Sequence, residues 1–347
     1  MVEANANHEK SSGVWVIVEN DPSKNTPRKV TYELISEARV LADELHEAVT
    51  AVYLCEAAEE QAGRAMEDAG CDRLLCVTNR MLREYHSELF ADIIAKLAKE
   101  RKPSIILVPG TENGRDYAPR VSAKLKAGLT ADCTDLAINE KNELVQIRPT
   151  YGGNLMAYIT TPNHRPQMAT IRPNVFTVRS CGRRCKLETE ELPVSIDETA
   201  LRSRRLNFEH KELSCADITE ADIVLVGGYG LGKENLQQLY RLASKMDAAV
   251  GVTRKVVDEG WAPFELQIGQ TGKNIAPELC ILFGVSGALQ HTIGIRNAKK
   301  IIAVNSDPTA AVFKISNVAI LADAAEIISR MTEQADEIKN EGDLVWH

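Results

Sequence analysis

The chain has 347 residues, of which 44% are hydrophobic, and its formal net charge is -8. At roughly 150 residues a domain, this length predicts two domains, each able to bury a core. The acidic balance argues against a protein that binds nucleic acid through a basic surface, and we expect a cytoplasmic location. No run approaches the roughly 18 apolar residues of a membrane-spanning helix, so we expect no membrane insertion.

The beginning of the chain and its cysteines give no sign of secretion or of a metal site. Residues 1–13 lack the apolar core of a secretory signal and are predicted to be a flexible lead-in. Most of the eight cysteines stand in apolar runs, where a free thiol packs as a small hydrophobic side chain. Only Cys181 and Cys185 lie close together, and their three-residue gap differs from the two-residue gap of zinc and redox pairs. We therefore expect no metal.

Strands and helices alternate through the first third of the chain, which predicts a parallel, doubly wound sheet. The expected helices are amphipathic, and the expected strands are short apolar runs between turn residues. Strands are predicted at 14–18, 48–54, 73–77 and 104–108, with helices at 27–45, 57–69, 88–99 and 115–125.

The pattern changes after Lys126. Three strand-like pieces, at 144–148, 155–160 and 167–172, follow with turns such as Gly152-Gly153 between them. Because no helix separates them, we expect antiparallel additions to the sheet. The polar stretch that follows has no sustained period from 181 to 213 and is expected to be an extended linker, with the domain boundary near its end. The first domain is predicted to span 14–205, with a linker at 206–217.

A second α/β series fills the rest of the chain. It predicts a domain at 218–337 and a charged tail at 338–347. Strands are expected at 223–226, 279–285, 300–304 and 318–321, with helices at 234–246 and 324–336. The predicted fold is therefore α/β with two domains, each a mostly parallel doubly wound sheet, and the second domain is Rossmann-like.

Polar or glycine-rich turns follow the strands of this second series, where parallel sheets bind their ligands. Gly227 to Gly232 reads GGYGLG, which is not a GxGxxG motif and is equally compatible with an ordinary strand-to-helix turn. Residues 270–272 offer amide, hydroxyl and backbone donors, and 286–291 offer Ser286, which can cap a short helix, with Gln290 and His291. Three polar clusters at three strand ends predict a nucleotide-sized ligand.

Single residues in these clusters leave two interpretations open. Arg254 is either a surface charge or faces an anionic ligand, and His291 is either structural or a ligand contact. If the nucleotide-sized ligand is a flavin, a positive group beside it would stabilise the charge of the reduced ring and raise the reduction potential of the flavin. The chain has no GxSxG, Walker A, HExxH or paired CxxC motif, and thus no obvious nucleophile with a base.

Several long motifs, in order, resemble the alpha subunit of electron-transfer flavoproteins. In the second half they are GGYGLG, AAVGVTR, QIGQTG, PELCILFGVSGALQH and AVNSDP. In the first half, GRDYAPRVSAKLKAGLTADCTDL and RPTYGGNLMAYITTPNHRPQMATIRP resemble bacterial members of the family. The resemblance runs from about residue 14 to 331 and implies a heterodimer whose beta subunit packs on the first domain. It also implies one FAD in the second domain, and a second FAD or AMP mainly in the beta subunit.

The resemblance also implies roles for individual residues. Arg254 and His291 would lie near the isoalloxazine ring with Gln270 and Thr271, and Thr271 would donate toward the flavin N5. Gly284, Ser286 and Gln290 would contact the ribityl or pyrophosphate part, and Asn305 and Asp323 the adenosine end. The expected FAD contacts are Gly228, Tyr229, Gly230, Thr253, Arg254, Gln267, Gly269, Gln270, Thr271, Gly272, Gly284, Val285, Ser286, Gly287, Ala288, Gln290, His291, Asn305, Asp307 and Asp323.

Two further features bear on the type of electron carrier. Tyr229 stands where family members usually have arginine. The absence of that arginine would lower the flavin potential or leave Arg254 as the principal nearby cation. The segment 163–167 resembles that of electron-bifurcating relatives, which implies that Arg165 reaches the second nucleotide; the alternative is an ion pair at the subunit interface. We expect bifurcation, in which electrons from NADH divide between ferredoxin and, through the FAD of this chain, an acyl-CoA dehydrogenase or a related flavoenzyme.

Three alternatives stay open. The chain could serve a non-bifurcating electron-transfer flavoprotein that only accepts electrons from dehydrogenases. It could be a nucleotide-dependent hydrolase or transferase, although it lacks a nucleophile or metal motif. It could be a nucleotide-sensing protein, although the first domain alone would suffice for that. On the favoured interpretation the chain is a carrier subunit, catalytic only within a larger complex.

Overall fold

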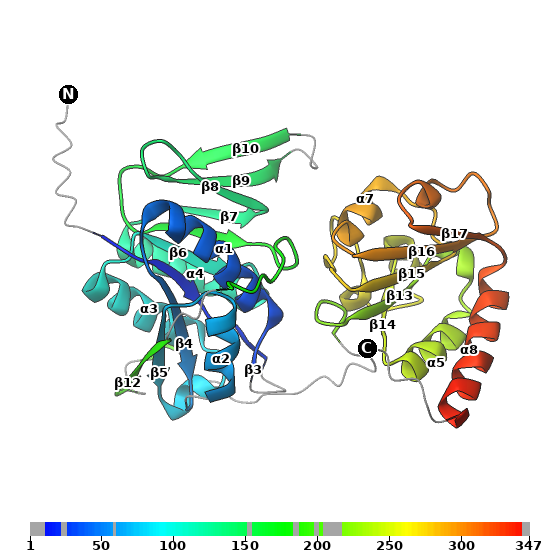
Figure 1. Ribbon diagram of the computed structural model, residues 1–347, viewed down its shortest axis with the longest axis horizontal. Coiled ribbons are helices and arrows are strands. Elements are labelled where there is room, and N and C mark those ends of the chain that lie inside the picture. The colour runs from blue at the N-terminus through cyan, green and yellow to red at the C-terminus, as the bar shows by residue number, and fades with distance from the viewer. Residues whose placement is uncertain are drawn as a thin grey trace. The chain divides into compact units, whose positions relative to one another are not determined.

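The computed structural model describes residues 11–21, 26–57, 60–150, 155–182, 187–197, 201–203 and 217–341. The chain divides into two compact units, residues 1–208 and 209–347 (Figure 1). The predicted linker lies outside the described residues except for Asp217, as do the Gly152-Gly153 turn, Cys185 and most of the predicted lead-in. Within the described part of the chain, every helix falls short of the length and apolar character needed to cross a bilayer.

Unit 1 is built on a seven-stranded, all-parallel sheet in the order β12-β5-β4-β1-β6-β11-β7 (Figure 1). The central strands are buried along their whole length, as in a sheet covered on both faces. The strands are β1 (Val14–Ile17), β4 (Val49–Cys55), β5 (Arg73–Thr78), β6 (Ile105–Pro109), β7 (Leu129–Cys133), β11 (Gln167–Ile171) and β12 (Glu188–Pro193). The helices are α1 (Lys29–Leu45), α2 (Glu60–Asp68), α3 (Ser87–Arg101) and α4 (Glu112–Leu125).

Each face of this sheet has its own core. Val14 and Val16 pack with residues of α1 and α2, whereas Trp15 and Ile17 pack with residues of α3 and α4. Alternate side chains of one strand thus enter opposite cores, as the two-residue period of a strand requires. Helices therefore cover both faces of unit 1, which confirms the doubly wound α/β fold.

Two strand predictions for unit 1 are wrong. The piece at 167–172 was expected to be antiparallel, but β11 runs parallel between β6 and β7 and is buried throughout. Its apolar run fits a covered central strand, and the preceding pieces form a separate antiparallel sheet in the order β10-β9-β8. The stretch at 181–213 was expected to be an extended linker, but part of it forms β12, a parallel edge strand beside β5.

The remaining strands of unit 1 are short additions. The antiparallel sheet consists of β8 (Asp135–Ile138), β9 (Leu144–Thr150) and β10 (Leu155–Thr160). A two-stranded pair consists of β2 (Asn20–Asp21) and β3 (Thr26–Pro27). Pro27, which was expected to begin the first helix, lies in β3, and α1 begins at Lys29.

Unit 2 has a five-stranded, all-parallel sheet in the order β14-β13-β15-β16-β17, and α5 and α8 pack against each other beside it (Figure 1). The strand order reverses direction between β13 and β15, which is the switch point at which such sheets bind ligands. The strands are β13 (Ile223–Gly227), β14 (Ala249–Val252), β15 (Leu279–Phe283), β16 (Lys300–Asn305) and β17 (Val318–Leu321). The helices are α5 (Leu236–Met246), α6 (Arg254–Asp258), α7 (Leu289–Thr292) and α8 (Ala324–Glu341), so that α8 extends into the predicted tail.

Unit 1 also has a reversal of strand order, between β1 and β6, but its own side chains occupy that edge. The buried carboxylate of Glu19, just after β1, accepts a hydrogen bond from Asn113 Nδ2 at 2.9 Å. Burial raises the pKa of Glu19, and the hydrogen bond from Asn113 opposes this rise. The corresponding edge of unit 2 is built differently.

At the switch point of unit 2, two backbone segments approach so closely that only glycine fits. The Gly228 N–H donates to the Phe283 carbonyl at 2.8 Å, and the Gly230 N–H donates to the Gly284 carbonyl at 3.1 Å. A Cβ on Gly228 would lie 2.2 Å from the Gly284 carbonyl oxygen. Gly284 has a φ of +63°, and a Cβ there would lie 2.4 Å from Leu231 N. This crossing ties the end of β13 to the end of β15.

Gly284→Ala should therefore destabilise unit 2 by roughly 2–5 kcal/mol, since it adds a steric clash to left-handed backbone strain. Gly260→Ala is the matched control, because Gly260 has a φ of +69° and a Cβ there would meet nothing within 4 Å. The control should lose only about 1–2 kcal/mol. Urea denaturation of both variants measures the difference, and equal losses would contradict the steric account.

Candidate functional site

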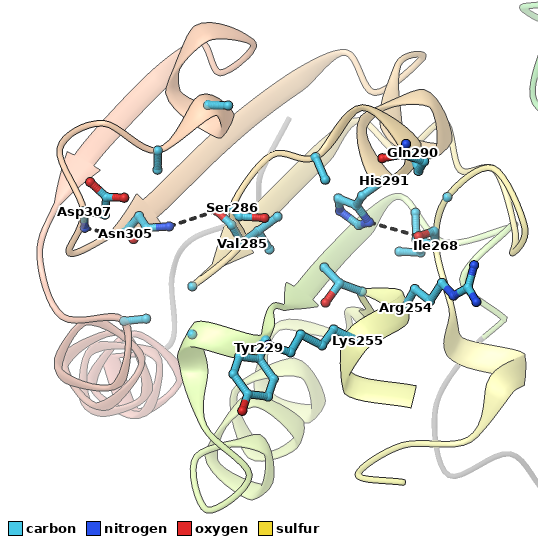
Figure 2. Close-up of a pocket in the computed structure, with 18 of the residues that line it drawn as sticks. Tyr229, Arg254, Lys255, Ile268, Val285, Ser286, Gln290, His291, Asn305 and Asp307 are labelled. Carbon is cyan, nitrogen blue, oxygen red and sulfur yellow. Dashed lines mark hydrogen bonds between the residues drawn. The ribbon is translucent and has the colours of Figure 1, made fainter. Parts of the chain in front are cut away.

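A cleft of about 1090 Å³ opens at the carboxyl ends of the strands of unit 2 (Figure 2). This volume is at the upper end of the roughly 300–1,000 Å³ typical of small-molecule sites. Among the predicted contacts, only Gly228, Gly272 and Gly287 do not line the cleft. Those that line it are Tyr229, Gly230, Thr253, Arg254, Gln267, Gly269, Gln270, Thr271, Gly284, Val285, Ser286, Ala288, Gln290, His291, Asn305, Asp307 and Asp323.

Backbone hydrogen bonds hold the loop of residues 267–273 against β14 and α7. The Ile268 N–H donates to the Val252 carbonyl at 2.9 Å, and the Gln270 N–H donates to the Gln290 carbonyl at 2.7 Å. Because the main chain makes these contacts, the side chains of Gln270 and Gln290 stay exposed at the cleft. The loop is thus fixed without using the groups that would face a ligand.

His291 presents a buried polar atom at the cleft wall. Its ring is 6% exposed, and Nδ1 donates to the Ile268 carbonyl at 2.9 Å (Figure 2). Burial lowers the pKa of His291, and the hydrogen bond to Ile268 opposes this only in part. Nε2 is buried and has no hydrogen-bond partner among the described residues. His291 is therefore a neutral imidazole whose Nε2 can accept a hydrogen bond from a ligand, rather than a fixed positive charge.

Gln267 prepares Thr271 for a contact in the cleft. The buried Gln267 side chain donates from Nε2 to Thr271 Oγ1 at 3.0 Å. With its oxygen accepting this bond, Thr271 keeps its own O–H proton to donate elsewhere. The geometry thus makes Thr271 a hydrogen-bond donor at the exposed rim of the cleft.

Charged residues missed by the sequence analysis lie beside Arg254. Arg254 Nε is 3.3 Å from Asp258 Oδ2, an ion pair four residues apart on α6. Lys255 Nζ lies 3.6 Å from the centroid of the Tyr229 ring. The spacing of Arg254 and Asp258 is that of helical ion pairs and could have indicated the partner of the arginine. Nothing in the sequence indicates Lys255, because its contact partner, Tyr229, lies in a different turn of the chain.

The residues expected at the adenosine end build the wall of the cleft. Asn305 donates from Nδ2 to the Val285 carbonyl at 2.9 Å and accepts from Asp307 N at 3.0 Å. Asp307 accepts from the Thr309 hydroxyl at 2.7 Å and the Thr309 N–H at 2.8 Å, and these bonds lower the pKa of Asp307. Asp323 Oδ1 accepts from Ala325 N at 2.8 Å and caps α8.

The capping role expected of Ser286 is wrong, and the nucleotide contact expected of Arg165 stays a prediction. Ser286 does not cap α7, because the cap position is Ala288, which has no side-chain hydrogen bond. Arg165 lies in unit 1, in the turn between β10 and β11, where its Nη1 donates to the carbonyls of Pro162 at 3.3 Å and His164 at 3.2 Å. Its guanidinium is thus held by its own turn.

Comparisons with known proteins agree over most of the chain. The family profile described as the electron transfer flavoprotein domain matches residues 14–197, and the one described as the electron transfer flavoprotein FAD-binding domain matches 217–296. Protein FixB of Clostridium saccharobutylicum is 40% identical, over 94% of this chain and 97% of that protein. Electron transfer flavoprotein subunit alpha of Thermoanaerobacterium thermosaccharolyticum is 37% identical, over 94% and 98%. Lactate dehydrogenase (NAD(+),ferredoxin) subunit LctC of Acetobacterium woodii is 35% identical, over 95% and 78%.

The buried neutral state of His291 predicts a pH-dependent stability. The unfolded imidazole takes up a proton near its ordinary pKa of 6.5, whereas the folded imidazole stays neutral to lower pH. The stability contributed by His291 is therefore present above pH 6.5 and lost as the pH falls below it. His291→Gln should remove this component from urea denaturation curves recorded between about pH 8 and 5. His164→Gln, at an exposed turn, is the control; an unchanged pH slope in His291→Gln would refute the assignment.

Proposed function

The chain belongs to the alpha-subunit family of electron transfer flavoproteins, and from this premise we propose that it carries electrons on one FAD bound in the cleft of unit 2. The observation that carries the proposal is the cleft at the β13–β15 switch point. Hydrogen-bonding groups from separate loops and the two cations of α6 converge there. The sheet order is that of flavodoxin-like folds, in which a flavin sits at the switch point.

The residues of the cleft suit FAD. Gly230 and Gly284 line the cleft with backbone atoms, and Arg254 and Lys255 offer positive charge to a diphosphate or a reduced ring. The buried Nε2 of His291 lacks a partner within the described chain, so a ligand would satisfy it. When bound, FAD supplies the redox chemistry by taking up and releasing electrons.

The protein side of electron transfer consists of holding and orienting groups. Thr271 donates from its hydroxyl, with its oxygen fixed by Gln267. His291 accepts at Nε2, with its ring fixed by the Ile268 carbonyl. Asn305 joins the ends of β15 and β16 and closes one side of the cleft. Preorganised groups of this kind tune the potential of a flavin without bond-making chemistry.

We also propose a beta subunit as the partner of unit 1 and an acyl-CoA dehydrogenase-type flavoenzyme as the redox partner. The edge strand β10 supports an interface, because it exposes 58% of Leu155, 45% of Met156 and 71% of Tyr158. Large apolar side chains on an unpaired edge are costly in water and are typical of surfaces that another chain covers. A second FAD or AMP would then lie mainly in the beta subunit.

The assignment of FAD predicts that Ala288→Trp blocks the site. Ala288 is exposed at the cleft wall, so an indole there should weaken FAD binding at least about tenfold, by roughly 1.4 kcal/mol or more. Leu289→Trp is the control, because Leu289 is 66% exposed but does not line the cleft. FAD is titrated into each protein co-expressed with its beta subunit and stripped of flavin. A colourless wild-type complex that takes up no FAD would contradict the proposal.

The finer proposal is an electron-bifurcating complex. The name of the LctC relative pairs NAD(+) with ferredoxin, which supports this type over a simple carrier. NADH should then reduce ferredoxin only when the dehydrogenase and an enoyl-CoA, which it can reduce to the acyl-CoA, are present, because the two electrons leave by separate routes. Spectroscopy of ferredoxin with and without the acceptor checks this. No reduction of ferredoxin under either condition, in a complex whose flavin the dehydrogenase and its acyl-CoA substrate still reduce, would favour the non-bifurcating alternative.

A further inference from the structure

Two neighbouring cations on the cleft wall have different partners. Arg254 and Lys255 both lie at the start of α6 and diverge from it, Lys255 toward Tyr229 (Figure 2). Arg254 forms an ion pair with Asp258. Lys255 Nζ instead lies over the Tyr229 ring, and no carboxylate of the described chain lies within ion-pair distance of it. Its positive charge is therefore not neutralised by an acidic side chain.

Tyr229 is itself fixed by Trp261. The two rings stack with centroids 5.0 Å apart and planes inclined by 16°. Trp261 follows α6 and donates its backbone N–H to the Val256 carbonyl at 3.1 Å, so the same short segment carries both Lys255 and the ring that supports Tyr229. Tyr229 thus contacts both Trp261 and Lys255 through its ring, although it is 42% exposed.

An aromatic face holds a cation differently from a carboxylate. The electron-rich ring attracts the ammonium and restricts its position, but it carries no net charge and leaves the charge of the lysine available to a ligand. A carboxylate partner, such as Asp258 for Arg254, offsets the charge that it positions. Of the two cations, Lys255 therefore offers the cleft a positive charge without an attached negative one.

We propose that Lys255 is a binding residue for the negative charge of FAD and that the stacked Tyr229 and Trp261 side chains position it; this rests on the FAD site proposed above. That negative charge belongs either to the diphosphate or to the reduced ring, and an ammonium group favours both in the same way. Tyr229 acts through Lys255 and is a positioning residue.

Lys255→Met tests the binding role in the full chain co-purified with its beta subunit. We expect the dissociation constant of FAD to rise about threefold to tenfold, or the midpoint potential of the flavin to fall. Equal weakening of ADP assigns the charge to the diphosphate, and a lower potential with unchanged ADP binding assigns it to the ring. Lys300→Met removes the same charge at the amino end of β16, away from the cleft, and should change neither quantity.

Tyr229 variants test the positioning role. Tyr229→Leu removes the aromatic face and should reproduce at least half of the Lys255→Met loss, whereas Tyr229→Phe keeps the face and should retain most of the affinity. The Tyr229→Leu/Lys255→Met double variant should lose no more than Lys255→Met alone, because both changes remove one interaction. Additive losses, or a Tyr229→Leu protein equal to wild type, would overturn the positioning role.

The outcomes separate this inference from the function on which it rests. A wild-type complex that binds FAD, with Lys255→Met and Lys300→Met behaving alike, would overturn the role of Lys255 and leave the FAD site intact. A wild-type complex that binds no FAD would overturn both. Far-ultraviolet circular dichroism of each variant checks that the fold is kept.

Discussion

The cleft depends on the close crossing of two backbone segments at the switch point of unit 2. The turn after β13 and the end of β15 are joined by hydrogen bonds from Gly228 and Gly230, and the crossing leaves no room for a Cβ at Gly228 or Gly284. The residues that follow these two strand ends line the cleft. The main chain supplies most of the bonds that hold the loops, so the side chains of Thr271, Ser286 and Gln290 remain at the surface of the cleft.

Charges of both signs line this cleft, namely the cations of Arg254 and Lys255 and the carboxylates of Asp258, Asp307 and Asp323. The chain has a net charge of -8, yet Arg254 and Lys255 lie together on one wall. Burial keeps His291 neutral, so the positive charge comes from these two side chains and not from the histidine. The resemblance to the family leads one to expect an arginine at position 229. The structure instead has a tyrosine there with an ammonium group on its ring, so a cation still reaches this part of the wall.

Much of unit 2 could be predicted from the sequence because its signals are local. Apolar runs that end in glycine or polar turns indicate the strand ends, and strand ends of a parallel sheet share one edge. Features that depend on contacts between distant segments could not be predicted in this way. The parallel pairing of β11 depends on burial between β6 and β7, and β12 is a polar strand that only its pairing with β5 reveals. Likewise, the contact of Lys255 with Tyr229 joins two turns that follow different strands.

On the proposed function, FAD occupies this cleft with its flavin in reach of His291. The most direct measurement is an experimental structure of the chain in complex with its beta subunit and FAD. We expect electron density for the flavin between the 267–273 loop and α7, with His291 Nε2 at hydrogen-bond distance from it and Nδ1 still bonded to the Ile268 carbonyl. A flavin bound elsewhere on unit 2, or a His291 Nε2 without a contact to the ligand, would contradict it.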